Sequence, residues 1–324
     1  MTAQPPPLTD LDRAILDVLT SDPQASARMV ADALNMPVAQ VAPRIRAMDR
    51  RKVSGILAVL DLAAAGQQVC FVLIDVRSVS VESVSAQIAP LAQVILVSTL
   101  LGGSHDLLVI VRFRTLGTLH ELLSNQIGRI EGIYRSVASI VLDIALFRPQ
   151  YLRHDPGSET TDMVRDLAEE FPEDQVDEVD RQILAELLLN ARQSIKAVAR
   201  KCQINASTVR YRIRALEGRG LMRFITVLNP AALGIGAFAL VEIEPEANRL
   251  ADVIANLRNK SWLPQIFVTT GPAPIKGILQ AENIRAIMEI KNQELTQIEG
   301  ITRVEISTLV GTRKMDLRWG QKYV

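Results

Sequence analysis

Apolar residues recur at helical spacing in three short segments after residue 8 and again in three segments after residue 176. In the second set, Asp177, Ser194 and Asn205 stand where N-cap residues are expected, so each predicts the start of a helix. The last two helices are joined by a tight turn, and the β-rich run 221–227 predicts a strand after them. This order is typical of a winged helix-turn-helix domain.

The third of these helices has two chemically different faces. Val209, Ile213 and Leu216 lie at i, i+4 and i+7, so we expect them to face the core. Polar and basic residues then project from the opposite side. The candidate DNA-binding residues are Ser207, Thr208, Arg210, Tyr211 and Arg214 of this helix, together with Lys196 and Arg223.

Two further regions predict alternating strands and helices in the order β-α-β-β-α-β, which is that of a ferredoxin-like sandwich. Helices cover one face of such a sheet and leave the other face bare and apolar. Because the chain contains two such regions, we expect each to cover the other in an intramolecular pseudo-dimer. The predicted strands are 69–76, 94–101, 107–113 and 137–146, then 237–243, 266–270, 277–280 and 302–311; the predicted helices are 81–89, 116–127, 250–257 and 284–298.

The chain aligns with itself at a shift of 168 residues. Fourteen of the forty-five positions from 8 to 52 are identical to their counterparts, and the segment 130–133 reappears as 298–301. One register over both parts predicts a duplicated two-part unit. The predicted fold is therefore α+β, with two tandem copies of a winged helix-turn-helix followed by a ferredoxin-like βαββαβ ligand-sensing domain. The predicted boundaries are 8–56 and 177–228 for the helix-turn-helix domains, 66–147 and 233–319 for the sensing domains, and 148–176 for a linker.

Charge is distributed locally, although the whole chain has a formal net charge of zero. The segment 194–224 carries eight basic residues against Glu217 alone. A cationic surface of this kind suits phosphate neutralisation, and guanidinium groups also bind guanine edges. A soluble helix with a merely charged outer face would usually mix both signs. The segment 155–178 carries ten acidic residues and one basic residue, which predicts a solvated connector or, alternatively, a cover for the basic helix.

The first copy departs from this DNA-reading pattern. Pro43 takes the place of Tyr211 in mid-helix, where proline removes a backbone hydrogen bond, and Pro37 takes the place of Asn205. We predict that residues 8–56 form a degenerate copy that folds in the same way and reads DNA poorly. The alternative is that this copy binds a different sequence.

The remaining composition narrows the class of protein. The two cysteines, Cys70 and Cys202, predict neither a disulfide framework nor a metal cluster, as expected in a reducing cytosol. We expect no cofactor, no membrane association and no signal peptide, because residues 1–7 contain neither a basic nor an apolar region. The predicted location is the cytoplasm, in association with the nucleoid.

Taken together, these motifs resemble the Lrp/AsnC, or feast/famine, family of transcriptional regulators. The resemblance implies double-stranded DNA as a partner, homo-oligomers such as homodimers assembled through the sensing sheets, and an amino acid or related small metabolite as effector. The residues that carry it are 180–184, 207–209, Arg212, Arg214, Leu216, Glu217, 220–221, Asn229, Pro230, 233–234, 103–108 and 132–133.

The resemblance also indicates an effector site at a glycine turn that ends in aspartate, where backbone N–H groups hold a carboxylate and the aspartate meets an amine. The first copy keeps this turn, whereas Pro272 and Pro274 interrupt it in the second. An ordinary hairpin turn is the alternative. The candidate effector-binding residues are Gly103, Ser104, His105, Asp106, Thr270 and Gly271.

Two other functions remain open. Sirohaem decarboxylases resemble the same family, but the three histidines are scattered here, and His105 is expected to be an exposed turn residue. We therefore predict no enzyme activity. The other alternative is an architectural DNA binder without a ligand. If the first helix-turn-helix is defective, two chains are needed to read two half-sites.

Overall fold

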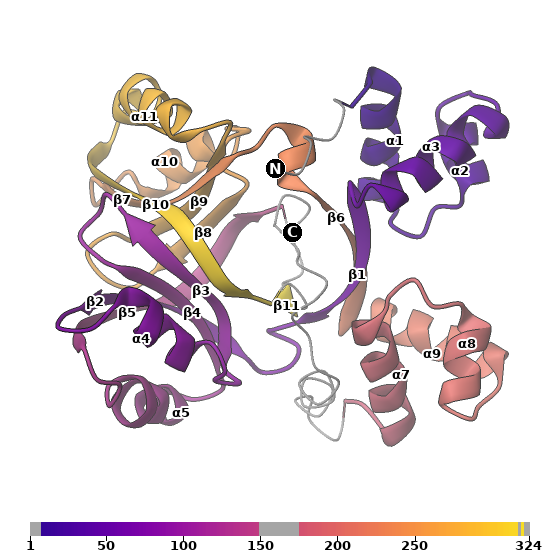
Figure 1. Ribbon diagram of the computed structural model, residues 1–324, viewed down its shortest axis with the longest axis horizontal. Coiled ribbons are helices and arrows are strands. Elements are labelled where there is room, and N and C mark those ends of the chain that lie inside the picture. Colours follow the sequence, from indigo (N-terminus) through magenta and orange to yellow (C-terminus); the bar gives the residue numbers. More distant parts are fainter. Residues whose placement is uncertain (1–7, 149–174, 317–318, 321–324) are drawn as a thin grey trace.

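The computed structural model describes residues 8–148, 175–316 and 319–320. Eight strands form a closed barrel. Figure 1 shows this barrel on one side of the molecule and two helical bundles on the other, with a curved ribbon of strands between them. The acidic linker predicted at 148–176 lies almost wholly outside the described residues. The described part of the chain contains no helix long and apolar enough to cross a membrane.

Both bundles form from the segments predicted to be helical. The first consists of α1 (Asp10–Ser21), α2 (Ala27–Ala33) and α3 (Val38–Arg50), and the second of α7 (Glu178–Leu189), α8 (Ile195–Lys201) and α9 (Ala206–Gly218). The side chains of Asp177 and Ser194 accept the predicted capping hydrogen bonds. Asn205 precedes α9, but its side chain makes no cap bond. The proline at position 43 is accommodated inside a continuous α3.

The strand after each bundle does not form the predicted wing. Instead, β1 (Ser54–Asp61) pairs antiparallel with β6 (Met222–Leu228), so that Leu57 lies opposite Ile225. We call this pair of strands the ribbon. The prediction of a winged domain was wrong because each strand finds its partner in the other half of the chain rather than in a hairpin of its own. This pairing satisfies one edge of each strand. The short strand β11 (Trp319–Gly320) adds to β1 in parallel.

The first half of the barrel has the predicted β-α-β-β-α-β order. Its strands form one antiparallel sheet in the order β3-β4-β2-β5. The second helix of this half ends in a turn of π-helix, so the predicted helix 116–127 appears as two segments. The elements are β2 (Gln68–Val76), α4 (Val81–Ile88), β3 (Val94–Leu101), β4 (Leu107–Phe113), α5 (Leu116–Glu121), η1 (Leu122–Ile127) and β5 (Ile133–Phe147).

The second half repeats this order after a short 3-10 turn, η3 (Pro230–Leu233). Its sheet has the strand order β8-β9-β7-β10. The elements are β7 (Ala237–Pro245), α10 (Leu250–Leu257), β8 (Gln265–Thr269), β9 (Ile275–Ala281), α11 (Ile284–Gln293), η4 (Leu295–Gln297) and β10 (Ile301–Met315).

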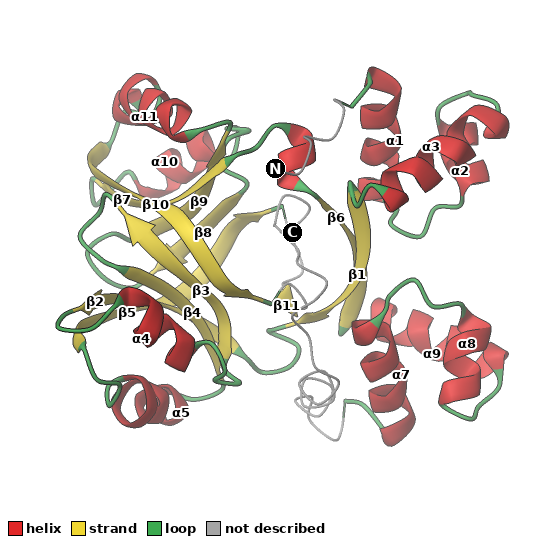
Figure 2. Ribbon diagram, viewed as in Figure 1, coloured by secondary structure: helices red, strands yellow, loops and turns green. Residues whose placement is uncertain are grey.

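The two sheets join edge to edge and close the barrel (Figure 2). We call the β3–β10 junction seam A and the β5–β8 junction seam B; Leu100 pairs with Leu309 in seam A, and Val141 with Thr269 in seam B. The apolar sheet faces that no helix covers pack against each other inside the barrel. Phe71 and Phe267 are in edge-to-face contact there, with 5.1 Å between their ring centroids. The expected intramolecular pairing of the two sheets is therefore confirmed, and closure leaves few strand edges open.

Each bundle packs on the ribbon strand that follows the other bundle in the chain. The core of the first bundle includes Leu228 of β6, and the core of the second includes Ala58 and Leu60 of β1. Each bundle thus buries apolar side chains of the strand that comes from the other half of the chain. This arrangement holds the two bundles on the side of the ribbon that faces away from the barrel (Figure 2).

Candidate functional site

The exposed face of α9 carries most of the predicted DNA-binding residues. Val209, Ile213 and Leu216 are buried, as their spacing predicts. Tyr211 is 74% exposed, an unusual exposure for a large aromatic side chain. Ser207, Arg210 and Arg214 are exposed as well, whereas Thr208 is half-buried.

Arg212 belongs to the same helix but has a different role. Its guanidinium Nη1 lies 2.5 Å from Oδ2 of Asp177 and 2.9 Å from Oδ1 of Asp180, both at the start of α7. This hydrogen bond holds the pKa of Asp177 below its ordinary value. Arg44 makes the same contact with Asp12 in the first bundle, at 3.0 Å. Arg44 and Arg212 therefore connect helices within each bundle. Both arginines are identical between the two halves of the chain, but so are Arg46 and Arg214, so identity did not separate structural arginines from DNA-binding ones.

The basic segment 194–224 is therefore only partly free for a partner. Lys201 is paired with Glu186, and Arg219 donates to the backbone carbonyl of Gln175. Arg223 is half-buried in the ribbon opposite Val59. Among the residues that the structure describes, four exposed cations of this segment make neither an ion pair nor a side-chain hydrogen bond within the molecule: Lys196, Arg200, Arg210 and Arg214.

The corresponding face of α3 has little polar chemistry. Pro43 is exposed where α9 presents Tyr211, and Ala39 is exposed where α9 presents Ser207. Val38, at the start of the helix, is 41% exposed. Arg46 remains exposed at the position of Arg214. Arg50 is exposed one turn after Arg46, but alanine and proline in place of serine and tyrosine leave this face with fewer hydrogen-bonding groups for DNA than α9 has.

A salt bridge links the two bundles directly. Arg192, in the turn between α7 and α8, donates from Nη2 to Oδ1 of Asp49 in α3 at 2.7 Å. Together with the ribbon, this contact gives α3 and α9 a defined relative placement within one chain. Two helix-turn-helix units held in this manner are the arrangement that a protein dimer normally provides for two half-sites.

The predicted effector turn lies at seam A. The backbone N–H of Ser104 donates to Oε1 of Glu305 on β10 at 2.8 Å. A Cβ added at Gly103 would lie 1.8 Å from Oγ of Ser307, so only glycine fits there. Burial raises the pKa of Glu305, but hydrogen bonds from Ser104 and the nearby cationic Arg303 outweigh burial and lower it overall. A carboxylate of the protein itself thus occupies the position predicted for an effector carboxylate.

The other two residues of this turn are also held by internal contacts. His105 is not exposed as expected: its side chain is 12% accessible, and Nδ1 lies 2.5 Å from Oδ1 of Asp75. Asp106 accepts a hydrogen bond from the backbone N–H of Val76 at 2.7 Å. The chain bends sharply enough here to bury the imidazole against β2, which the sequence did not indicate. These contacts connect the turn to both β2 and β10.

Thr270 and Gly271 do not join the other predicted effector residues. They lie at seam B, where Thr270 Oγ1 accepts from the backbone N–H of Ile140 at 2.9 Å. Gly271 has a left-handed backbone, with φ of +104°. Pro272, which follows, has no N–H to offer an anion. The six candidate residues thus form two separate turns rather than one site.

The interiors of the two barrel halves differ in charge at matched positions. In each half, one residue of a central strand pairs with a residue on each of the two neighbouring strands. These three residues are apolar in the first half and charged in the second half. Lys276, which is 2% exposed, forms an ion pair with Glu242. The apolar set is Leu73, Leu108 and Val137, and the charged set is Glu242, Lys276 and Glu305.

The fold and this surface define a class: a helix-turn-helix protein joined to a ferredoxin-like domain of the ligand-binding type. Residues 176–217 match the model of the AsnC-type helix-turn-helix domain, and residues 69–151 match the model of the Lrp/AsnC ligand binding domain. Two regions of the chain are thus similar to the two domains of Lrp/AsnC-type regulators. The two matches fall on the second helix-turn-helix region and on the first sensing region.

Known proteins support this assignment. An uncharacterized HTH-type transcriptional regulator of Pyrococcus furiosus is 29% identical over 146 residues, which are 45% of this chain and 96% of that protein. The HTH-type transcriptional regulator LrpA of Pyrococcus horikoshii is 26% identical over 130 residues, which are 40% of this chain and 92% of LrpA. The crystal structure of the siroheme decarboxylase NirDL has a TM-score of 0.60 and 12% identity, covering 96% of this chain and 94% of that one. This last likeness shows the fold alone.

Proposed function

We propose that the protein is an Lrp/AsnC-type transcriptional regulator that binds double-stranded DNA through α9. The observation that supports the proposal most is the exposed surface of Tyr211, Arg210 and Arg214 on a helix whose opposite face is buried. Exposed arginines supply bidentate donors to guanine and neutralise phosphates, and Ser207 adds a hydroxyl. The matches to helix-turn-helix regulators favour the same function.

Selection of bound sequences from random duplex DNA, followed by binding curves on the selected site, tests this proposal. Arg214→Ala removes a base or phosphate contact and should weaken binding about tenfold, since each good contact contributes about 1–3 kcal/mol. Arg285→Ala is the matched control, because Arg285 is an exposed arginine on α11, far from α9 (Figure 1). Equal affinity of wild type and Arg214→Ala for the selected site would reject α9 as the reading helix.

The identities between residues 8–52 and their counterparts, and the common element order of the two halves, support an origin by tandem duplication. We propose a division of labour in which α9 reads DNA and α3 does not. Two chains then supply two reading helices, in line with homo-oligomers. Arg46→Ala and Arg214→Ala occupy matched positions, so equal losses of affinity would reject the division, whereas a loss confined to Arg214→Ala would support it.

We further propose that the turn 102–106 binds the carboxylate of a small metabolite, such as an amino acid, by replacing Glu305 at the Ser104 N–H. The match to the Lrp/AsnC ligand binding domain over 69–151 supports this assignment. The DNA selection, repeated with and without pooled amino acids, measures whether such a metabolite changes operator affinity. A regulator of this kind would act in the cytoplasm, at the nucleoid.

A further inference from the structure

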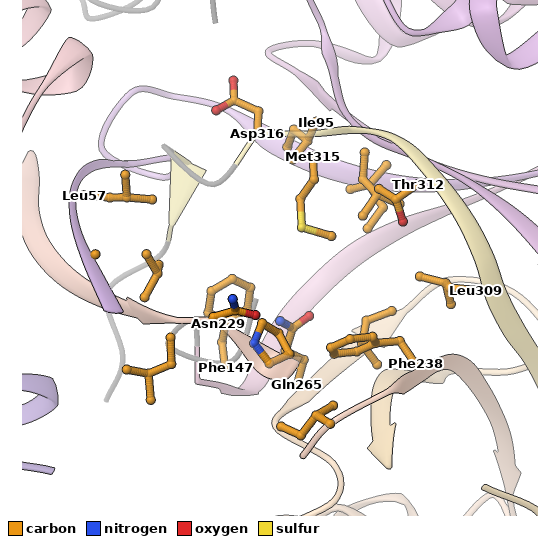
Figure 3. Close-up of a pocket in the computed structure, with 18 of the residues that line it drawn as sticks. Leu57, Ile95, Phe147, Asn229, Phe238, Gln265, Leu309, Thr312, Met315 and Asp316 are labelled. Atoms are coloured by element: carbon orange, nitrogen blue, oxygen red, sulfur yellow. The ribbon is translucent and has the colours of Figure 1, made fainter. Parts of the chain in front are cut away.

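A cavity of about 1110 Å³ lies between the ribbon and the open end of the barrel. Leu57 lies on the ribbon side, and Leu309, Thr312 and Phe238 lie on the barrel side (Figure 3). Neither of the turns at the seams contributes to its wall. The cavity is therefore distinct from the predicted effector turn and from the DNA-binding surface of α9.

The wall of the cavity is predominantly apolar. Four phenyl rings contribute to it from both sheets, with Met315 of β10 beside them. Concave spaces with mostly apolar walls and a few polar groups are typical of sites that bind a small organic molecule. The volume of this space is slightly above the usual range of about 300–1,000 Å³ for such sites. The rings are those of Phe71, Phe147, Phe238 and Phe267.

One buried side chain in the wall of this apolar space has an amide N–H without a partner. Gln265, at the start of β8, is 4% exposed, and its side-chain Nε2 has no hydrogen-bond partner among the described residues. The residue lines the cavity (Figure 3). Because buried amide donors are almost always satisfied, an orphaned N–H at a cavity wall indicates an acceptor that the ligand supplies.

The charged residues of the wall indicate the charge of that ligand. Among the described lining residues, Lys52 and Arg192 are balanced by Asp49 and Asp316, and Arg192 is already paired with Asp49. The described part of the wall therefore offers no excess charge to compensate an ion, and burying an uncompensated ion is costly. We infer that the cavity is a binding site for a neutral, largely apolar organic molecule whose carbonyl oxygen accepts a hydrogen bond from Gln265 Nε2.

Two fluorescent probes test this site on the full chain without DNA, so the outcome is independent of the proposed regulator function. Nile red is neutral and apolar and carries a carbonyl; diphenylhexatriene is a hydrocarbon of comparable size without an acceptor. Gln265→Leu should weaken Nile red binding about fivefold to tenfold, the loss expected for one hydrogen bond, and leave diphenylhexatriene binding unchanged. Equal effects on both probes, or no effect on Nile red, would overturn the role of the amide.

A second pair of variants tests the cavity itself. Leu57→Trp places a larger side chain on the ribbon side of the cavity and should reduce the affinity for both probes at least tenfold. Leu142→Trp is the matched control, because Leu142 is 66% exposed on β5, and it should bind both probes as wild type does. Unfolding curves establish that each variant is folded. Wild-type protein that fails to bind either probe, or Leu57→Trp protein that binds them normally, would overturn the proposal.

Discussion

The backbone N–H of Ser104 and the carboxylate of Glu305 are joined by a 2.8 Å hydrogen bond although they are 201 residues apart in the chain. This contact connects a turn of the first barrel half to a strand of the second. It places a carboxylate of the protein where the family resemblance predicts the carboxylate of an effector. If the turn binds an effector carboxylate as we propose, Glu305 is the group that the effector has to displace.

Replacing Glu305 should reveal whether its carboxylate competes with an effector carboxylate for the Ser104 N–H. Glu305→Ala removes the internal carboxylate and leaves the Ser104 N–H free, so amino-acid affinity should rise about tenfold, the equivalent of about 1.4 kcal/mol. Isothermal titration with the metabolite that alters DNA binding measures the change. Glu299→Ala is the control, because the Glu299 side chain is 85% exposed and lies outside the turn. Lower affinity in Glu305→Ala would show that Glu305 belongs to the site rather than competing for it.

Glycine at position 103 should be required for the same seam. Gly103→Ala brings a methyl group to within 1.8 Å of Ser307 Oγ, and Ser307 is 2% exposed and has little room to move. Overpacking of this kind costs about 1–3 kcal/mol in the free energy of unfolding, which urea denaturation measures.

Two further variants sharpen this test. Ser307→Ala removes the clashing oxygen, so the double variant should recover part of the lost stability. Gly218→Ala adds a methyl group where nothing lies within 4 Å and should be neutral or slightly stabilising. A Gly103→Ala protein as stable as wild type would show that the seam is more compliant than its packing indicates.

The end of α3 contains a strained residue that the second half avoids. Lys52 has φ of +53°, whereas Gly220, at the matched position after α9, has φ of +71°. A side chain in this left-handed conformation costs about 1 kcal/mol relative to glycine. Lys52→Gly should therefore stabilise the protein by about 1 kcal/mol, and Gly220→Ala should destabilise it by a similar amount. Thermal unfolding of the two variants measures these opposite signs, and a destabilised Lys52→Gly protein would contradict the argument.

Local sequence patterns predicted the helices and strands well, but they did not predict which distant strands pair with each other. The caps at Asp177 and Ser194 and the period-two strands of the barrel depend on neighbouring residues, so the sequence specifies them. The pairing of β1 with β6 does not depend on neighbouring residues, because the sequence of a single apolar strand does not indicate which strand it pairs with. For this reason the sequence predicted a wing in place of this pairing.

The candidate site shows the same division. Exposure of Tyr211 and Arg214 follows from helical periodicity, and the structure places both on the outer face of α9. The roles of Arg212 and Glu305 depend on contacts with residues 32 and 201 positions away, respectively. The count of basic residues in 194–224 included Arg212 without showing that this arginine pairs within the molecule, and the contact of Glu305 with Ser104 was not predicted. A charged residue among apolar neighbours on a barrel strand is the signal that could have drawn attention to Glu305.

Arg212 should affect stability and its dependence on pH rather than DNA reading. Its hydrogen bond lowers the pKa of Asp177 in the folded state, so the resulting stabilisation is present above the unfolded pKa of about 3.9 and is lost as the pH falls through the folded value. Arg212→Gln also leaves Asp180, whose side chain is 11% exposed, without its cation. We expect a loss of about 1 kcal/mol at neutral pH, because the Asp177 side chain is 54% exposed and solvent screens part of the interaction.

Urea denaturation of wild type and Arg212→Gln from pH 7 to pH 3 measures this dependence. The difference between the two proteins should shrink below about pH 4, because protonated Asp177 no longer attracts the guanidinium. Arg210→Gln is the matched control, since Arg210 is exposed two residues earlier on α9, and its stability should follow wild type at every pH. A constant difference between Arg212→Gln and wild type across this range would mean that packing of the Arg212 stem, rather than its charge, holds α7 and α9 together.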